Sequence, residues 1–453
     1  MKHYITGIFF LFTAILKAQT GEPTPPNDNS PFSRLGLGDL VNQNFAASAA
    51  MGNLSATFQD AYHLNLQNPA ASAFLKSTSY ELGLNYRRST IEDKVTSVKT
   101  NHGAINYLAL GFPLKNQVNE LFDKRKKSTY SLGMHFGLVP FSNIAYNVQS
   151  TKVVPNAGKT SFAYTGTGGT YKFFWGNSIA FKNVAVGLNL GYLFGRSRSD
   201  RSIEFSDLQY YYQNRLIDNT TYRGFVWNIG TQYVYDFMKT GEKGKKEPSG
   251  KKLIFGIYGN SATNFNTVVN GIYTRTNYSY ISNITGPAVD TILKERTDGI
   301  TGKGKLPAEV SMGVCFQKGT KLRLGVNYTY GAWNQYKNDA KSETLSNTSR
   351  IGAGVEYTPE ANSYNKYTRR ISYRFGVNSW SDPRSLNNQQ VKGTSASIGF
   401  GLPLILPRQQ ISFLNFGFEI GKLGTDALKQ NYFKTTLGLT FNDNSWFYKR
   451  RFN

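Results

Sequence analysis

The stretch VAVGLNLGYLFG, residues 184–195, decides the fold of this chain. Its bulky apolar side chains fall on every second position, and alanine, glycine or asparagine occupies most positions between them. A period of two is that of a β-strand, in which successive side chains point to opposite faces. The pattern therefore predicts a strand with one apolar face and one face of small or polar residues.

The same alternation recurs through most of the chain downstream of Phe74. It is clear in 80–86 and 130–138, and it returns around Trp227, Val314, Val326, Val355, Phe375, Ile398, Phe416 and Leu437. In a soluble sandwich the apolar face would point into a core. Here nearly every segment is long enough to cross a bilayer when tilted, and aromatic residues gather near segment ends. The sequence therefore predicts an all-β fold, a transmembrane antiparallel β-barrel with lipid outside and water or polypeptide inside.

About 14 segments carry this pattern, an even number such as closed bacterial barrels have. They are 77–88, 103–112, 129–139, 170–181, 184–196, 221–237, 252–262, 308–317, 321–333, 349–359, 370–380, 393–402, 410–421 and 431–441. The count becomes sixteen if 143–152 and 263–280 pair as well. With both termini of the chain in the periplasm, short turns are expected at 182–183, 318–320 and 407–408, and long outer loops at 197–220, 263–307, 334–348 and 381–392. Two periplasmic turns, 113–128 and 238–251, are longer than usual.

Composition favours the same class of protein. Glycine, tyrosine and phenylalanine number 44, 29 and 31, and mean hydropathy is −0.41. No apolar run beyond the N-terminus is long enough for a spanning helix, which argues against a helical membrane protein. The single cysteine, Cys315, cannot form an internal disulfide and suits a strand better than a redox site.

The N-terminal residues 1–18 have the features of a secretory signal peptide. Lys2 precedes an apolar stretch from Ile5 to Leu16, and Ala18 suits a cleavage site. Residues 19–32, rich in proline, are expected to be an extended lead-in. Together with the barrel pattern at 77–453, these features predict a bacterial outer-membrane protein.

Between the lead-in and the first strand, residues 33–76 are expected to form a hatch inside the barrel. Their centre, Ala46–Phe74, is small and weakly polar, and no part of it could span a bilayer. Asn68-Pro69-Ala70 is its sharpest signal, because proline fixes its own φ and biases Asn68 towards extended geometry. The tripeptide is therefore predicted to be a turn that ends one element before the first strand.

The alternate positions of the predicted strands whose side chains face the lumen are mostly polar. Their charged and imidazole members include the lumen-facing candidates His135, Arg323, Glu356, Arg374 and Glu419. An unpaired buried charge would cost several kcal/mol. We therefore expect these side chains to find partners in the hatch, in each other or in water, in pairings that the sequence does not identify.

The chain is strongly basic, with 52 lysines and arginines against 28 acidic residues and a net charge of +24. Nucleic acid is not the expected partner, because a secreted barrel does not meet it and no RNA-binding signature accompanies the charge. Many cations fall near the predicted periplasmic turns: 124–127, 243–252, 369–370 and 449–451. They predict a solvated rim near lipid phosphates or a docking surface for a periplasmic protein.

Motifs of enzymes and metal sites are not found. The sequence has four histidines and no nucleophile elbow, HExxH, paired-cysteine or calcium-loop motif. We predict that the protein is not an enzyme and has neither a metal nor a cofactor.

With hatch and barrel both in view, the chain resembles the FadL/TodX family of outer-membrane transporters for long-chain fatty acids and other hydrophobic compounds. The resemblance lies in 49–52, in Asp60-Ala61-Tyr62, in Asn68-Pro69-Ala70, in the glycine segment 166–169, and in 306–309 with Trp333-Asn334-Gln335-Tyr336. It covers nearly the whole mature chain. Carried over from the family pattern, Asp60, Asn68, Pro69 and Ala70 are the candidate hatch residues.

The resemblance implies about 14 strands, N- and C-termini in the periplasm, and passive uptake of hydrophobic small molecules released through an opening in the barrel wall. Pro140 is a candidate marker of that opening, since proline donates no ladder hydrogen bond, although an ordinary strand end explains it too. The polar, basic lumen argues against fatty acid specifically. The alternative is a non-transporting component of an outer-membrane protein secretion or assembly complex.

Overall fold

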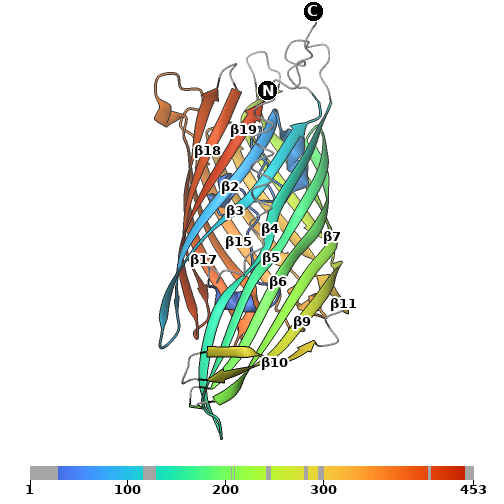
Figure 1. Cartoon of the computed structure of the whole chain (residues 1–453). Coiled ribbons are helices and arrows are strands. Elements are labelled where there is room, and N and C mark those ends of the chain that lie inside the picture. The colour runs from blue at the N-terminus through green and yellow to red at the C-terminus, as the bar shows by residue number, and fades with distance from the viewer. Residues whose placement is uncertain are drawn as a thin grey trace, which may run out of the picture.

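The structure is a computed structural model that describes residues 29–115, 129–205, 207–208, 210–240, 246–279, 284–293, 300–406 and 410–443. It is a closed antiparallel barrel of 14 strands with an N-terminal segment in its lumen (Figure 1). The signal peptide 1–18, most of the lead-in, the turn 407–408 and the cations 124–127 and 449–451 lie outside the described residues.

The barrel strands are β2 (Thr78–Glu92), β3 (Ser97–Pro113), β4 (Tyr130–Val154), β5 (Gly158–Phe181), β6 (Val184–Phe205), β7 (Tyr210–Thr240), β8 (Lys246–Asn260), β12 (Glu309–Lys318), β13 (Leu322–Gly331), β15 (Thr348–Tyr357), β16 (Ser372–Leu386), β17 (Gln389–Leu406), β18 (Gln410–Gly424) and β19 (Lys429–Asp443). β8 pairs with β12 and β13 with β15, and β19 closes the barrel on β2, with Asp443 opposite Thr78. Each overlaps one of the predicted ranges, and β4, β5, β6 and β7 are much longer than predicted. The alternation of apolar and small residues was therefore sufficient to find every spanning strand.

The alternative count of sixteen is wrong. Residues 143–152 are the continuation of β4, and 263–280 falls on β9 (Thr263–Ser279), which pairs with the outer part of β7. β9 also pairs with β10 (Ile284–Leu293) and β11 (Ile300–Leu306), and β11 pairs with the short β14 (Lys337–Asn338). These strands enlarge the sheet beyond the barrel and do not join the spanning set.

The two rims of the barrel differ greatly. At the turn rim, defined by the tight turns 182–183 and 319–320, the strands end close together, whereas at the tall rim β4 to β7 run on far beyond their neighbours, with β9 beside them (Figure 1). The predicted outer loops 197–220 and 263–307 are thus largely strands. On β6 the outward parity changes from Phe194 to the charged Arg196 and Arg198, so the apolar alternation ends there although the ladder continues. The alternation of apolar residues therefore ends where contact with lipid ends, and the strand itself continues beyond that point.

The predicted loop 381–392 is instead a hairpin between β16 and β17. Asn387 and Asn388 both have positive φ, 51° and 62°, which is the conformation of a two-residue type I′ turn. Asparagine tolerates this left-handed region better than most residues do. The Asn-Asn pair was the sequence signal for the turn.

The N-terminal segment fills the middle of the lumen. It carries η2 (Pro31–Arg34), β1 (Asp39–Leu40), the one-turn helix α2 (Ala46–Ala49) and η3 (Pro69–Phe74), and most of its side chains are buried. We call residues 29–41 the strap and residues 42–76 the plug. No helix in the described part of the chain is long and apolar enough to cross a membrane.

Candidate functional site

Inward-facing glycines of the barrel seat the backbone of the plug. A Cβ on Gly376 would lie 1.9 Å from the amide nitrogen of Gly52, and one on Gly133 would lie 2.1 Å from the carbonyl oxygen of Ser72. Any side chain at these wall positions would collide with main chain, which cannot move aside as a flexible side chain can. The small residues on the inward parity are therefore the surface against which the plug packs.

Asn68-Pro69-Ala70 forms the turn that the sequence predicts. Asn68 is extended (φ −103°, ψ 101°), its side chain accepts a hydrogen bond from the amide of Ala70 at 3.2 Å, and η3 begins at Pro69. The Asn68 Nδ2 group also donates to the carbonyl of Ala56 at 2.7 Å and to that of Thr231 on β7 at 3.3 Å. The buried side-chain amide of Asn68 thus caps η3, bonds a second segment of the plug and bonds the barrel wall.

A closed ring of polar contacts fastens the plug to the opposite side of the wall. Arg323 on β13 lies 3.4 Å from Asp60 of the plug and 3.4 Å from Glu356 on β15. Arg374 on β16 donates to Glu356 at 2.7 Å. It also donates to Asn415 Oδ1 on β18 at 2.7 Å. Two carboxylates balance two guanidinium groups, as buried charges require.

His63 of the plug completes this ring. Because Asn415 Oδ1 accepts from Arg374, its Nδ2 group is the one that donates to His63 Nε2, at 3.1 Å. His63 Nδ1 then carries the proton and donates to Asp60 Oδ1, at 3.1 Å. Burial raises the pKa of Asp60, but the His63 hydrogen bond and the Arg323 charge outweigh it and hold this pKa well below its usual range. Asp60 is therefore a carboxylate.

Two predicted lumen residues lie outside the ring. His135 on β4 hydrogen-bonds the Ser72 hydroxyl of the plug and Asn189 on β6, the latter at 2.7 Å. Glu419 on β18 accepts from Tyr432 at 2.8 Å and pairs with Lys434 at 3.3 Å, so its contacts are with the wall alone. Of the five lumen candidates, three share one network, one holds the plug separately, and Glu419 does not touch the plug.

The sequence reasoning missed His63 of the plug and two residues of the wall as partners in this region. Asn415 closes the ring, and the buried Glu81 on β2 accepts a hydrogen bond from the amide of Leu64 at 2.5 Å. Both alternate with outward apolar neighbours, so the inward parity was a signal for them. Strand periodicity shows which face a residue lies on, but it does not show which residue of the plug it contacts.

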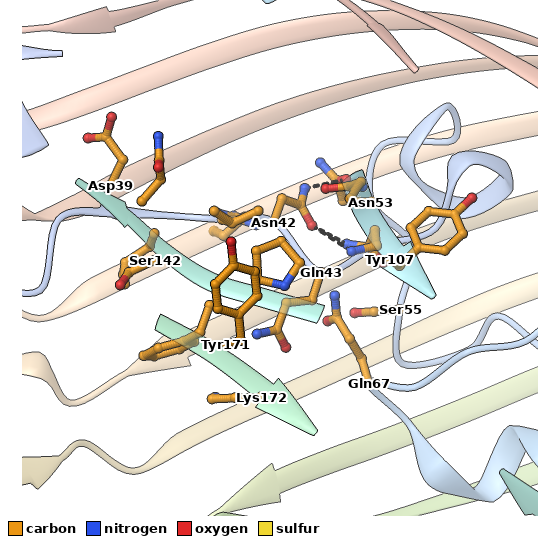
Figure 2. A pocket seen from close by; sticks show the side chains of 18 of the residues that line it. Asp39, Asn42, Gln43, Asn53, Ser55, Gln67, Tyr107, Ser142, Tyr171 and Lys172 are labelled. Carbon is orange, nitrogen blue, oxygen red and sulfur yellow. Dashed lines mark hydrogen bonds between the residues drawn. The ribbon is translucent and has the colours of Figure 1, made fainter. Parts of the chain in front are cut away.

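A cavity of about 830 Å³ lies between the plug and the tall rim. Asn42, Asn53 and Gln67 line it from the plug, and Tyr171 and Lys172 from β5 (Figure 2). The Lys172 ammonium sits 3.7 Å from the centre of the Phe141 ring. The lining is mixed, with many amides, a few charges and scattered aromatic rings.

The cavity reaches a seam in the barrel wall at Pro140. The β3–β4 ladder runs from Pro113–Gly133 only to Leu108–Leu138, and β4 has a register shift against β5 between Pro140 and Ser142. Leu108, Leu138 and Pro140 all contribute to the cavity lining. Pro140 therefore lies next to an interruption of the ladder; its role as an opening stays a prediction.

On the β4 side of this seam the strap takes the place of a strand. β1 pairs with β4 through Asp39–Asn143 and Leu40–Ser142, and the amide of Ser30 donates to Ala145 at 2.8 Å. The Asn29 side chain accepts from the amide of Asn147 at 2.9 Å and donates to its carbonyl at 3.1 Å. The Arg384 guanidinium on β16 pairs with Asp39, which ties the strap across the lumen to the far wall.

Among the described residues there is no cluster of three histidine, cysteine, aspartate or glutamate side chains that could hold a metal ion. Lys251, Lys252 and Lys318 lie together at the turn rim, since β8 and β12 pair Lys251 with Lys318. This part of the expected basic rim exists in the structure.

A comparison with protein-family models matches the BamG family over residues 1–453. The chain belongs to the BamG family. Its resemblance to FadL/TodX is therefore one of fold, and the family name is a different one. A search of curated protein sequences finds no match.

Solved structures with a similar fold include hydrocarbon channels and a FadL homologue. The CymD monoaromatic hydrocarbon channel shares 14% identity at a TM-score of 0.52, covering 90% of this chain and 99% of that one. A Pseudomonas aeruginosa FadL homologue shares 14% at 0.51 (88% and 98% covered), and the Ralstonia pickettii toluene transporter TbuX shares 10% at 0.52 (88% and 98%). At such low identity these matches establish the fold of the BamG-family barrel, and nothing about its ligand.

Proposed function

We propose that this BamG-family barrel is a non-transporting component of an outer-membrane protein assembly or secretion complex. The observation that carries the proposal is the way the plug is held. Its backbone touches inward glycines, and its Asp60 and His63 belong to a closed ring that reaches four wall strands. A plug held in this way fills the lumen as a permanent part of the barrel.

The family match supports the same conclusion, because it spans the whole chain and names a family other than that of the channels. The tall rim adds surface outside the bilayer that a passive pore does not need. The basic residues of the turn rim face the opposite compartment, where they offer a docking surface for an acidic partner or for lipid phosphates. In this proposal residues 1–18 are removed as a signal peptide, and the N- and C-termini of the chain lie in the periplasm.

The test is purification under gentle conditions. An affinity tag inserted between Asn387 and Asn388, in the exposed hairpin at the tall rim, leaves every ladder intact. We expect the tagged barrel to carry stoichiometric protein partners in mild detergent. We also expect its depletion to lower the amounts of other outer-membrane proteins. A folded barrel purified alone, with normal levels of the others, would contradict the proposal.

A second candidate, passive uptake of hydrophobic small molecules, is favoured by one observation. The cavity reaches the seam at Pro140, where a ligand could leave sideways into lipid. Burial of apolar ligand surface would contribute about 25 cal/mol per Å². Replacing Ala104, which lines the cavity, by tryptophan should then reduce uptake of acyl or aromatic compounds without changing the levels of other outer-membrane proteins. Unchanged uptake in both this variant and a deletion strain would remove the second candidate.

A further inference from the structure

The seam has two edges, one on β3 and one on β4, and among the residues that the structure describes only the β4 edge is paired with another segment. Above Leu108, β3 continues to Ser97 and β4 continues to Val154, yet in the described part of the chain no ladder joins them there. A register shift against β2 leaves Asn106 of β3 without a ladder partner on β2, and β4 has its own shift against β5 at Phe141. Bulges bend and twist a strand, and both strands have one close to the place where their pairing ends.

The β3 edge near the ladder end lies at the depth of the membrane. Ile105 and Leu108 point outward with 62% and 55% of their surface exposed, as lipid-facing side chains do. In hydrocarbon an unsatisfied backbone N–H or C=O group costs several kcal/mol, and open sheet edges are avoided there. The segment Gly103–Tyr107 pairs with β2 on one side, while its other edge has no ladder partner among the described residues.

The β4 edge shows what kind of molecule fits such a seam. It is covered by extended polypeptide, the strap, through the β1 pairing and through main-chain bonds at Phe141 and Ala145. A hydrocarbon or an acyl chain could fill space at the β3 edge but could neither donate to its carbonyls nor accept from its amides. An extended backbone does both, which is the basis of strand addition to a sheet edge.

We infer that the β3 edge at Gly103–Tyr107 is a docking site for a β-strand of a partner polypeptide. The site also constrains the side chains of that strand. Outward residues must be apolar because Ile105 and Leu108 face lipid beside them, and inward residues must be small or polar because the cavity behind holds Asn42 and Asn106. That is the alternating pattern of an outer-membrane barrel strand. The inference rests on the proposed function, and it names the class of partner.

A photo-crosslinking pair tests proximity. A benzophenone amino acid replaces Ile105 at the seam in one strain and Ile420 of β18 in the other; both isoleucines point outward, with 62% and 61% of their surface exposed. We expect the Ile105 probe to form an adduct with one defined polypeptide in intact cells, and the Ile420 probe to form none with that polypeptide. Adducts at both positions, or an Ile105 adduct with lipid or with a second copy of this chain, would overturn the inference.

A scan of disulfide pairs along the two segments tests whether they pair as β-strands. In a Cys315→Ser background, single cysteines at Gly103, Ala104 and Ile105 are combined with single cysteines along the crosslinked segment of the partner. Strand pairing requires the best disulfide partner to move by one residue for each step along β3. Disulfides that form without this dependence would overturn the inference. If stoichiometric partners copurify while the seam gives no adduct, the complex proposal stands and only the docking site fails.

Discussion

The strap and the plug meet the barrel by two different kinds of contact. The plug is held by buried side chains, with Asp60, Arg323 and Glu356 at the centre of a closed ring. The strap is held at the β4 edge mainly through backbone hydrogen bonds and two short polar side chains. Buried ionic contacts are costly to break singly, whereas main-chain pairing at an edge can be exchanged for pairing with another strand. This difference supports the two proposals made above, a plug that stays in the lumen and a seam that can pair with another strand.

The largest expected effect comes from breaking the ring. Glu356→Gln leaves the Arg374 guanidinium buried without a carboxylate, and removal of one partner of a buried pair costs about 3–5 kcal/mol. We expect a lower unfolding midpoint in urea and a higher permeability of cells to large antibiotics, because the plug loosens.

Glu419→Gln is the matched control for this change. Glu419 is also a lumen glutamate, but its partners, Lys434 and Tyr432, belong to the wall. It should lower stability without raising permeability. Equal permeability in the two variants would show that the ring does not hold the plug.

Asn68→Ala is expected to have the next largest effect. The change removes a helix cap, worth about 1 kcal/mol, and two further hydrogen bonds of buried groups, each with a net worth of about 1 kcal/mol. We expect a fall of about 2–3 kcal/mol in unfolding free energy and a modest increase in antibiotic entry. Asn228→Ala, which removes a single contact with the plug at Gln67, serves as the control and should change both readouts less.

The strands could be predicted from the sequence because every second residue of a spanning strand faces lipid and is apolar. The inward candidates Arg323, Glu356 and Arg374 were found for the same reason, as polar residues on the other parity. Their pairing was not predictable, since it depends on how strands far apart in the sequence are ordered around the barrel and on where Asp60 sits among them. The extent of the tall rim was missed because beyond Phe194 both faces of β6 meet water, and no apolar period remains to reveal the ladder.

Weakening the strap should have a smaller and local effect. Asn29→Ala with Ser33→Ala removes the side-chain contacts with the amides of Asn147 and Ala145. We expect faster hydrogen exchange at these two amides, with the unfolding midpoint changed by less than that of Asn68→Ala, because the β1 pairing and the Asp39–Arg384 ion pair remain. A large loss of global stability would instead make the strap as permanent as the plug.

Acid should have the smallest effect in the ordinary range of pH. Asp60 has a pKa below its unfolded value of 3.8, so its contribution to stability is complete above that value and is lost only as pH falls through the lower folded value. The difference in unfolding free energy between the wild type and Asp60→Asn should therefore be constant from about pH 5 to pH 8 and shrink below about pH 4. A difference that already shrinks between about pH 7 and pH 6 would contradict the assignment of this pH dependence to Asp60. The main-chain hydrogen bonds of the strap hold no ionisable group, so the loss of stability below about pH 4 should belong to the ring and not to the β1 pairing.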